Sequence, residues 1–412
     1  MPVKSLIKIW PLFFGLSLIG LALGVQNSLL GIRASLEGFD NQVTGLLMSC
    51  YFAGFLVGAL WAPRLIRQVG HIRTFGALTA LASSTILVHA IYVEPWVWGL
   101  MRLLTGFALS AIYVVAESWL NQASSNENRG QVLAVYMITM MAGICAGQFM
   151  LNLADPAEFT LFAVIAVMVS VAAIPILMTA LSTPVVEEVD KIGAALLWKR
   201  APIAIMGLVL SQWCASLVYG MGAVYATQLG MTVAQVANFM AAMLAGAMVL
   251  QWPLGRLSDF VDRRWVLAFA CVGSVASACV AANYATASWQ LYSVAFVFGG
   301  FCLSQYSLTV SIMNDNLRPK EIVPASGTIV MVAGLTSITG PISGAAWMEL
   351  FGIMSFFYLL ALSMAILAVI SVWRALTVPA VSDEFKIQST LHVPVATVGT
   401  VLHVEEDVVE NE

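Results

Sequence analysis

The chain has 412 residues and a formal net charge of −4, and 60% of its residues are hydrophobic while only 10% are charged. A soluble domain carries about 25% charged residues, so a mean hydropathy of +0.90 excludes an ordinary soluble protein. The acidic excess lies at the end of the chain, because residues 1–376 hold 17 basic and 15 acidic residues. That balance gives no reason to expect a nucleic-acid partner.

Twelve long apolar runs follow one another along the chain. A run of roughly 20 apolar residues crosses the hydrocarbon core of a bilayer as a helix, and continuous rather than alternating runs exclude a porin-like barrel. We therefore expect an all-α integral membrane protein with twelve transmembrane helices. The expected spans are Trp10–Leu30, Thr44–Ala62, Thr74–Ile91, Trp96–Leu120, Gly130–Leu151, Phe159–Leu181, Ala201–Tyr225, Val233–Leu254, Trp265–Ala282, Trp289–Met313, Ile322–Trp347 and Phe351–Trp373.

The basic residues outside these runs indicate an orientation. Lys and Arg gather on the cytoplasmic side of membrane proteins. With the N-terminus inside and twelve spans, 16 Lys and Arg residues fall inside and only Arg33 falls outside. We therefore expect a multi-pass protein of the bacterial inner (plasma) membrane with both termini in the cytoplasm.

The two halves of the chain resemble each other. At an offset of 193 residues, five pairs of identical residues coincide, and transporters are often built from such repeats. We expect a six-helix half at residues 1–181, a central cytoplasmic loop at 182–200, a second six-helix half at 201–376 and an acidic, disordered tail at 377–412. The five pairs are Trp96 and Trp289, Gly106 and Gly299, Tyr113 and Tyr306, Ser118 and Ser311, and Asn121 and Asn314.

A loop after the eighth run resembles a signature of the major facilitator superfamily. The segment Gly255–Leu267 matches that signature at its glycine, its Asp and its pair of basic residues, and it departs at Phe260 and Asp262. The copy in the first half, Pro63–Arg73, has Arg67 where the Asp belongs. The resemblance implies two pseudo-symmetric six-helix halves and transport by alternating access.

A second resemblance lies in span four. Arg102–Gly106 looks like another signature of the superfamily, and the stretch from Arg102 to Gln148 is similar to the poorly characterised YcaD-type subgroup. This subgroup implies no settled substrate.

Span four carries the only Lys, Arg, Asp or Glu residues inside the apolar runs, Arg102 and Glu117. A charge at depth costs about 2.5–3.5 kcal/mol on insertion scales, so each must face a cavity or a partner. Arg102 fits either binding of an anionic or polar substrate group or a structural contact with backbone carbonyls. Glu117 fits a proton-carrying carboxylate, but its depth favours a gate or salt-bridge residue near Arg64, Arg67 or Arg129.

The resemblance also implies that spans one, four, seven and ten line a central path. Polar and aromatic residues on these spans are the candidates for that path, although interhelical hydrogen bonding is an alternative use for each. The candidates are Gln26, Asn27, Arg102, Tyr113, Gln212, Trp213, Tyr219, Gln305 and Tyr306.

Charged residues at the cytoplasmic ends of the spans are candidates for a gate. In the superfamily, the loop after span two docks on the start of span eleven, and the loop after span eight docks on the start of span five. We therefore expect Asp259 to pair with Arg129, and Arg67 with Glu321, in the outward-facing state. Arg263 completes this set of gate and coupling candidates.

These features predict a secondary active transporter that moves a small solute across the membrane. If transport is coupled to an ion, protons are favoured over sodium, because no carboxylate cluster could build a cation site. The alternative is a non-transporting membrane sensor on the same scaffold that signals through the tail. No enzyme signature is present, and we expect no cofactor, no metal, no nucleic-acid partner and a monomer in the lipid bilayer.

Overall fold

The computed structural model describes residues 3–122, 124, 129–178, 192–283 and 289–379, and it leaves the side chains of residues 3–9, 122, 129, 319 and 323 undescribed. Most of the expected central loop and nearly all of the expected tail lie outside the described residues. The described elements are α1 (Val3–Leu36), α2 (Asn41–Val69), α3 (His71–Ile91), α4 (Pro95–Gln122), α5 (Arg129–Phe149), η1 (Met150–Leu153), α6 (Thr160–Leu177), α7 (Ala194–Arg200), α8 (Pro202–Gln228), α9 (Val233–Phe260), α10 (Arg263–Asn283), α11 (Trp289–Leu303), α12 (Gln305–Asp315), α13 (Pro319–Phe351), η2 (Ile353–Ser355) and α14 (Phe356–Thr377).

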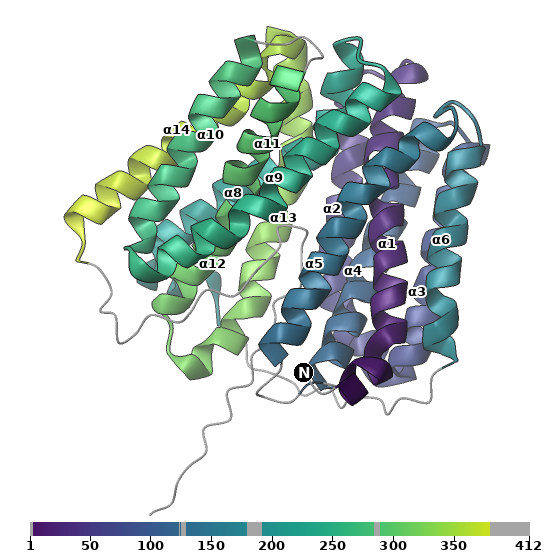
Figure 1. Ribbon diagram of the computed structural model, residues 1–412, viewed down its shortest axis with the longest axis horizontal. Helices are drawn as coiled ribbons and strands as arrows, with labels where there is room; N and C mark the ends of the chain where they lie inside the picture. The colour runs from purple at the N-terminus through teal and green to yellow at the C-terminus, as the bar shows by residue number, and fades with distance from the viewer. Residues whose placement is uncertain (1–2, 123, 125–128, 179–191, 284–288, 380–412) are drawn as a thin grey trace, which may run out of the picture.

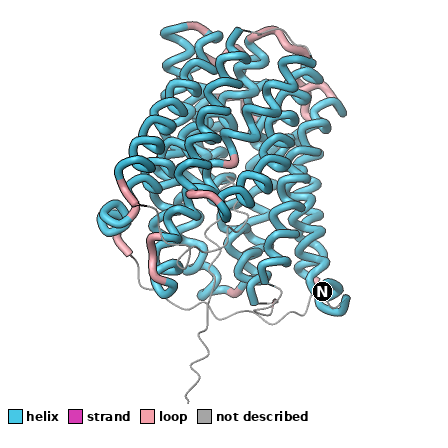
Figure 2. Tube along the Cα trace, turned by 60° about the vertical axis from the view of Figure 1, so that its left-hand side comes forward, coloured by secondary structure: helices cyan, strands magenta, loops and turns pink. Residues whose placement is uncertain are grey.

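Within the described residues, twelve stretches are long and apolar enough to cross a membrane. Figure 2 shows that helices account for nearly all of the described chain. The expected all-α membrane fold is therefore confirmed. One span differs from the expectation, because the tenth is made of two helices, α11 and α12, which meet at Ser304.

Local sequence signals set several helix ends. Thr232 accepts a hydrogen bond from the backbone of Gln235, and the Gln235 side chain accepts one from the backbone of Thr232, which is a capping box at the start of α9. Pro202 occupies the first turn of α8, where its missing N–H costs nothing. Gly70, with φ of +84°, forms the tight connection between α2 and α3.

The helices form two groups. In Figure 1, α1 to α6 lie on one side and α8 to α14 on the other. The groups repeat a close helix crossing: a Cβ on Gly106 of α4 would overlap the carbonyl oxygen of Tyr51 in α2, and a Cβ on Gly299 of α11 would overlap that of Met243 in α9. Only glycine permits this approach, so the sequence repeat corresponds to a repeated packing of two pseudo-symmetric halves.

The two halves meet along α1, α2 and α5 on one side and α8, α9 and α13 on the other. We call the end of the bundle where α1 begins the N-terminal face and the opposite end the far face. Near the far face, Gly45 of α2 and Gly220 of α8 both pack on Pro341 of α13; a Cβ on each would lie 2.6 and 2.8 Å from atoms of that proline. Gln228 also donates a hydrogen bond to Asn41 there. Both halves therefore contribute to closing the far face.

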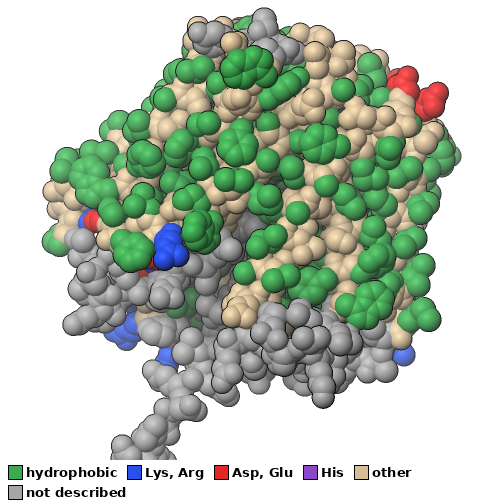
Figure 3. All heavy atoms as spheres, in the orientation of Figure 1, with side chains coloured by type: hydrophobic (Ala, Val, Ile, Leu, Met, Phe, Trp, Pro, Cys, Tyr) green, Lys and Arg blue, Asp and Glu red, His purple; other side chains and the backbone are tan. Residues whose placement is uncertain are grey.

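The outer surface is suited to lipid. Figure 3 shows hydrophobic side chains over most of the described part of one face, with few charged side chains, which lie at the upper right and toward the left and lower edges. Large apolar side chains such as Trp61, Trp252 and Val369 are 53%, 59% and 69% exposed. A soluble protein rarely exposes an apolar surface of this extent, which agrees with a bundle surrounded by a bilayer.

Candidate functional site

A cavity lies between the two halves, and the empty space in and around it, including space open to solvent, is about 800 Å³. Helices α1, α2 and α4 line it from the first half, and α8, α12 and α13 line it from the second. Its walls are Leu23, Asn27, Tyr51, Phe52, Phe55, Leu56, Arg102, Gln212, Ala215, Ser216, Tyr219, Gly220, Tyr306, Val330, Ala333, Gly334 and Ser337.

Arg102 is the charged group of this cavity. It lies seven residues into α4, about 10 Å along the helix from the far-face end. The side chain is 3% exposed, and its guanidinium carbon lies over the Tyr51 ring, 4.4 Å from the centroid. Its Nε and Nη1 atoms have no hydrogen-bond partner among the described residues. A buried cation with unused N–H donors is costly in the absence of an anion.

Five of the nine residues expected along the path line the cavity: Asn27, Arg102, Gln212, Tyr219 and Tyr306. The other four lie outside its lining. Gln26 and Tyr113 are buried in the first half, Trp213 donates to Ser343 of α13, and Gln305 donates to Ser274 of α10.

Two helices that the sequence did not place along the path contribute half of the wall. Tyr51, Phe52, Phe55 and Leu56 come from α2, and a stripe of small residues comes from α13. The Gly54 and Gly58 pair marks α2 as a close-packing helix in the sequence, but its aromatic residues carry no charge that would single them out. Depth and polarity alone therefore identify only part of such a cavity.

Glu117 lies elsewhere on α4, about 22 Å along the helix from Arg102. The side chain is 4% exposed, and the hydroxyl of Tyr136 donates a hydrogen bond to Oε1 at 3.3 Å. Among the described side chains, none forms a salt bridge with it. A buried carboxyl group without a cationic partner is costly to ionise, and the hydrogen bond from Tyr136 is its described polar contact.

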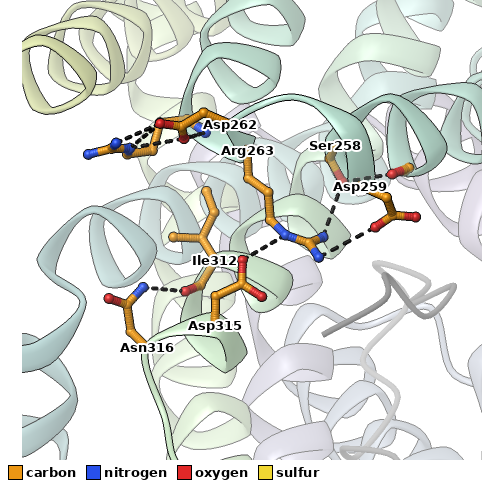
Figure 4. A network of polar contacts seen from close by, with 9 residues as sticks. Ser258, Asp259, Asp262, Arg263, Ile312, Asp315 and Asn316 are labelled. Carbon is orange, nitrogen blue, oxygen red and sulfur yellow. Dashed lines mark hydrogen bonds and ion pairs between the residues drawn. The ribbon is translucent and has the colours of Figure 1, made fainter. Parts of the chain in front are cut away.

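A network of charged residues occupies the N-terminal face of the second half (Figure 4). Arg263 donates through Nε to Asp315 at 2.7 Å and through Nη1 to Ser258 at 3.1 Å, and its Nη2 lies 3.4 Å from Asp259. Arg263 is only 3% exposed. The network ties the loop after α9 to the end of α12, and Asp315 is a member that the sequence did not single out.

The neighbouring arginine fixes a second junction in the same half. Arg264 is bound by Asp262 at 2.6 Å and donates through Nη1 to the backbone carbonyls of Arg374 and Val378. Asp262, one of the two departures from the superfamily signature, therefore serves to hold an arginine against the end of α14.

The two expected pairs between the halves concern another conformational state and stay predictions, and the described contacts of their members are as follows. Glu321 accepts a hydrogen bond from Arg200 and another from the backbone of Arg318. Asp259 contacts Arg263 of its own half. Arg67 is exposed on α2, and the side chain of Arg129 lies outside the described residues.

Nothing in the described part of the chain groups three or more His, Cys, Asp or Glu side chains as a metal site. The cavity brings polar groups of both halves together, among them Arg102 and Gln212.

A bundle of twelve membrane-spanning helices in two similar halves, with a partly polar cavity between them, defines a multi-pass membrane transporter. The family model described as Major Facilitator Superfamily matches this chain twice, at residues 12–227 and 203–405, and the chain belongs to that superfamily.

Bacterial relatives resemble it over most of their length. An uncharacterized MFS-type transporter from Yersinia pestis is 29% identical over 336 residues, covering 80% of this chain and 86% of the relative. The uncharacterized MFS-type transporter YcaD from Salmonella newport is 25% identical over 344 residues, covering 82% and 88%. The resemblance to the YcaD-type subgroup is thus confirmed.

Solved structures share the fold. The nucleoside transporter NupG superposes with a TM-score of 0.72 at 14% identity, covering 90% of this chain and 99% of that one. A bacterial homolog to the human lysosomal transporter Spinster, in an inward-facing and unoccupied conformation, gives 0.71 at 13% identity, covering 91% and 96%. At these identities the likeness concerns the fold.

Proposed function

We propose that this protein is a secondary active transporter of the bacterial inner membrane that moves a small solute by alternating access, with protons as the coupling ion. The single observation that carries the proposal is the cavity at the interface of the two halves, where a buried Arg102 presents N–H donors with no partner among the described residues. A structural arginine would be satisfied by carbonyls or carboxylates. An arginine left open toward a cavity between two movable bodies is suited to a solute.

The contacts between the halves support the rocking movement. At the far face, Gly45 and Pro341 join the two halves in van der Waals contact, and Asn41 joins Gln228. At the N-terminal face, the described contacts of Arg263 with Asp259 and Asp315 join parts of the second half. In our proposal the N-terminal face is cytoplasmic, as the distribution of Lys and Arg favours, so this conformation is closed toward the outside.

We assign the proton-binding role to Glu117. The carboxyl group is buried, hydrogen-bonded by Tyr136, and without a salt bridge among the described residues. Charging it there requires a rearrangement that brings water or a cation, because an isolated carboxylate is strongly disfavoured in an apolar environment. Protonation of such a group can therefore be linked to the conformational equilibrium. The sequence alone favoured a gate or salt bridge for this residue, and the Tyr136 contact is the reason for the change.

The test is flux in proteoliposomes. The purified full chain is reconstituted, a pH gradient is imposed, and uptake from pools of metabolites is followed by mass spectrometry. We expect at least one pool component to accumulate in the vesicles while the pH gradient is present. Its uptake should stop when the gradient is collapsed. A chain that binds pool components but moves none of them would be a sensor instead, and removal of residues 378–412 would then abolish its signal.

A further inference from the structure

The charge of the cavity defines the charge of its ligand. Arg102 is the only Lys, Arg, Asp or Glu among the described residues of the lining. It is 3% exposed, so water screens it little. A ligand with one negative charge would make the occupied cavity neutral. A cation, a zwitterion or a dianion would each leave an uncompensated charge at depth, which is strongly unfavourable.

The geometry of Arg102 defines the type of anion. The guanidinium group lies over the Tyr51 ring, and Tyr51 is itself buried, at 5% exposure. An arginine can rest on an aromatic face and still offer a planar set of N–H donors, which matches the two oxygens of a carboxylate. Nε and Nη1 of Arg102 are buried without a hydrogen-bond partner among the described residues. Because these two atoms lie on different edges of the guanidinium group, a bidentate contact would pair one of them with Nη2. The arginine is therefore suited to a carboxylate.

Two neutral polar residues line the cavity from the other half. Oε1 of Gln212 and the hydroxyl of Tyr219, both on α8, are buried and have no hydrogen-bond partner among the described residues. A hydroxyl or amide on the ligand can donate to one and accept from the other. Since Arg102 belongs to the first half and these groups to the second, one ligand with both functions would bridge the halves.

The remaining wall is uncharged and largely apolar. Phe52, Phe55 and Leu56 of α2 and Val330 and Gly334 of α13 supply apolar surface, while Asn27, Ser216, Tyr306 and Ser337 add polar groups. The apolar part of the wall favours an aromatic or aliphatic body by burial of its surface. A nucleotide would bring more than one negative charge to a cavity with a single arginine.

We infer that the ligand of this cavity is a small amphipathic organic monocarboxylate, with an aromatic or aliphatic body and one neutral hydrogen-bonding group such as a hydroxyl or an amide. The inference rests on the proposed function for the role of the ligand in transport. The chemical class of the ligand is argued from the residues of the cavity alone. Free amino acids are disfavoured because the lining offers no acid for their ammonium group, and dicarboxylates because it offers no second cation.

The experiment uses matched probes on the purified full chain. One series is 3-(4-hydroxyphenyl)propanoate, its amide, tyramine, L-tyrosine and 3-phenylpropanoate; a second is 8-hydroxyoctanoate with its amide, its amine analogue and octanoate. Affinity is measured from the shift of the thermal unfolding midpoint with probe concentration. We expect each hydroxylated carboxylate to bind about tenfold or more tightly than its amide, and the amines and L-tyrosine not to bind measurably.

Variants connect the affinities to the residues. Arg102→Gln should remove the preference for carboxylate over amide, and Arg102→Lys should keep part of it. Tyr219→Phe should reduce the preference for the hydroxylated over the plain carboxylate, with little change for octanoate. Arg33→Gln, which alters an arginine of α1 outside the cavity lining, is the matched control and should leave all probe affinities unchanged.

The outcomes separate this inference from the transporter proposal. Equal binding of amides or amines, or no binding by any carboxylate of either series, overturns the inference even when proteoliposomes move some other solute. Carboxylate binding that depends on Arg102 without any flux supports the ligand class and overturns transport. If Arg102→Gln does not fold, the wild-type probe series and Tyr219→Phe still decide the matter.

Discussion

Span α4 of the first half and its counterpart α11–α12 in the second show which features the fold requires and which it does not. Both carry a glycine pressed on a backbone carbonyl of a neighbouring helix, Gly106 and Gly299. Both carry a tyrosine at the next equivalent place, Tyr113 and Tyr306. The charges are not shared, since the positions equivalent to Arg102 and Glu117 hold Ala295 and Val310. Packing is common to the halves, and charge is particular to one.

The largest effect should come from the shared packing. Gly106→Leu and Gly299→Leu should each destabilise the bundle by about 3 kcal/mol or more, because the new side chain meets backbone rather than a movable side chain. The measurement is the amount of monodisperse protein extracted from membranes and its thermal midpoint. As a control, Gly327→Leu, where no atom lies within 4 Å of the added Cβ, should be tolerated. A large loss of stability in only one of the two variants would mean that the glycine contacts of the two halves are not equivalent.

Arg102→Ala should separate function from fold. The second half is stable with Ala295 at this place, so the variant should reach the membrane at the normal level. Flux or ligand affinity should fall about 10- to 100-fold, the range expected for loss of a charge-assisted hydrogen bond. The measurement is uptake normalised to the protein in the vesicles. Degradation of the variant would mean that Arg102 has a structural role.

Glu117→Gln should change pH dependence with little change in stability, because Val310 occupies the equivalent place. If the carboxyl carries the coupling proton, the variant should exchange solute across the membrane but no longer accumulate it with a pH gradient. Counterflow and gradient-driven uptake in the same vesicles measure the two properties. Tyr136→Phe, which removes the hydrogen bond and keeps the carboxyl, should shift the pH profile without abolishing coupling. Intact gradient-driven uptake in Glu117→Gln would mean that Glu117 does not carry the coupling proton, and the gate role predicted from the sequence would then be favoured.

The smallest effect concerns the loops that differ in charge between the halves. Arg67→Glu should shift the balance toward the state that is open at the cytoplasmic face, if Arg67 and Glu321 pair in the opposite state. Such a surface pair contributes about 0–1 kcal/mol, which changes a conformational equilibrium up to about fivefold. The shift can be followed by distance measurements between spin labels at the cytoplasmic ends of α2 and α13.

Adding Glu321→Arg to Arg67→Glu should restore the balance. Glu321 also binds Arg200 in the present conformation, so Glu321→Gln is needed as a control for loss of that contact. A double variant no closer to wild type than Arg67→Glu alone would mean that the pair does not form.

The sequence predicted the spans well because apolar length is a strong signal, and it identified Arg102 and Glu117 because charges are rare at depth. The aromatic residues of α2 were not identifiable in the same way. In a membrane helix the lipid-facing and inward-facing sides are both apolar, so hydrophobic periodicity does not show that Tyr51 and Phe55 face a cavity. The break at Ser304 was also hidden, since neither proline nor glycine marks it.

The contact around Pro341 has a consequence for the speed of the cycle. The surfaces that must part at this contact when the far face opens include Gly45, Ala345 and the carbonyl group of Pro341. Small side chains expose little apolar area on separation, and the free energy of burial scales with area. The barrier to opening at this point should therefore be low, and solute release on that side should be fast compared with the rearrangement of the buried groups at the centre of the bundle.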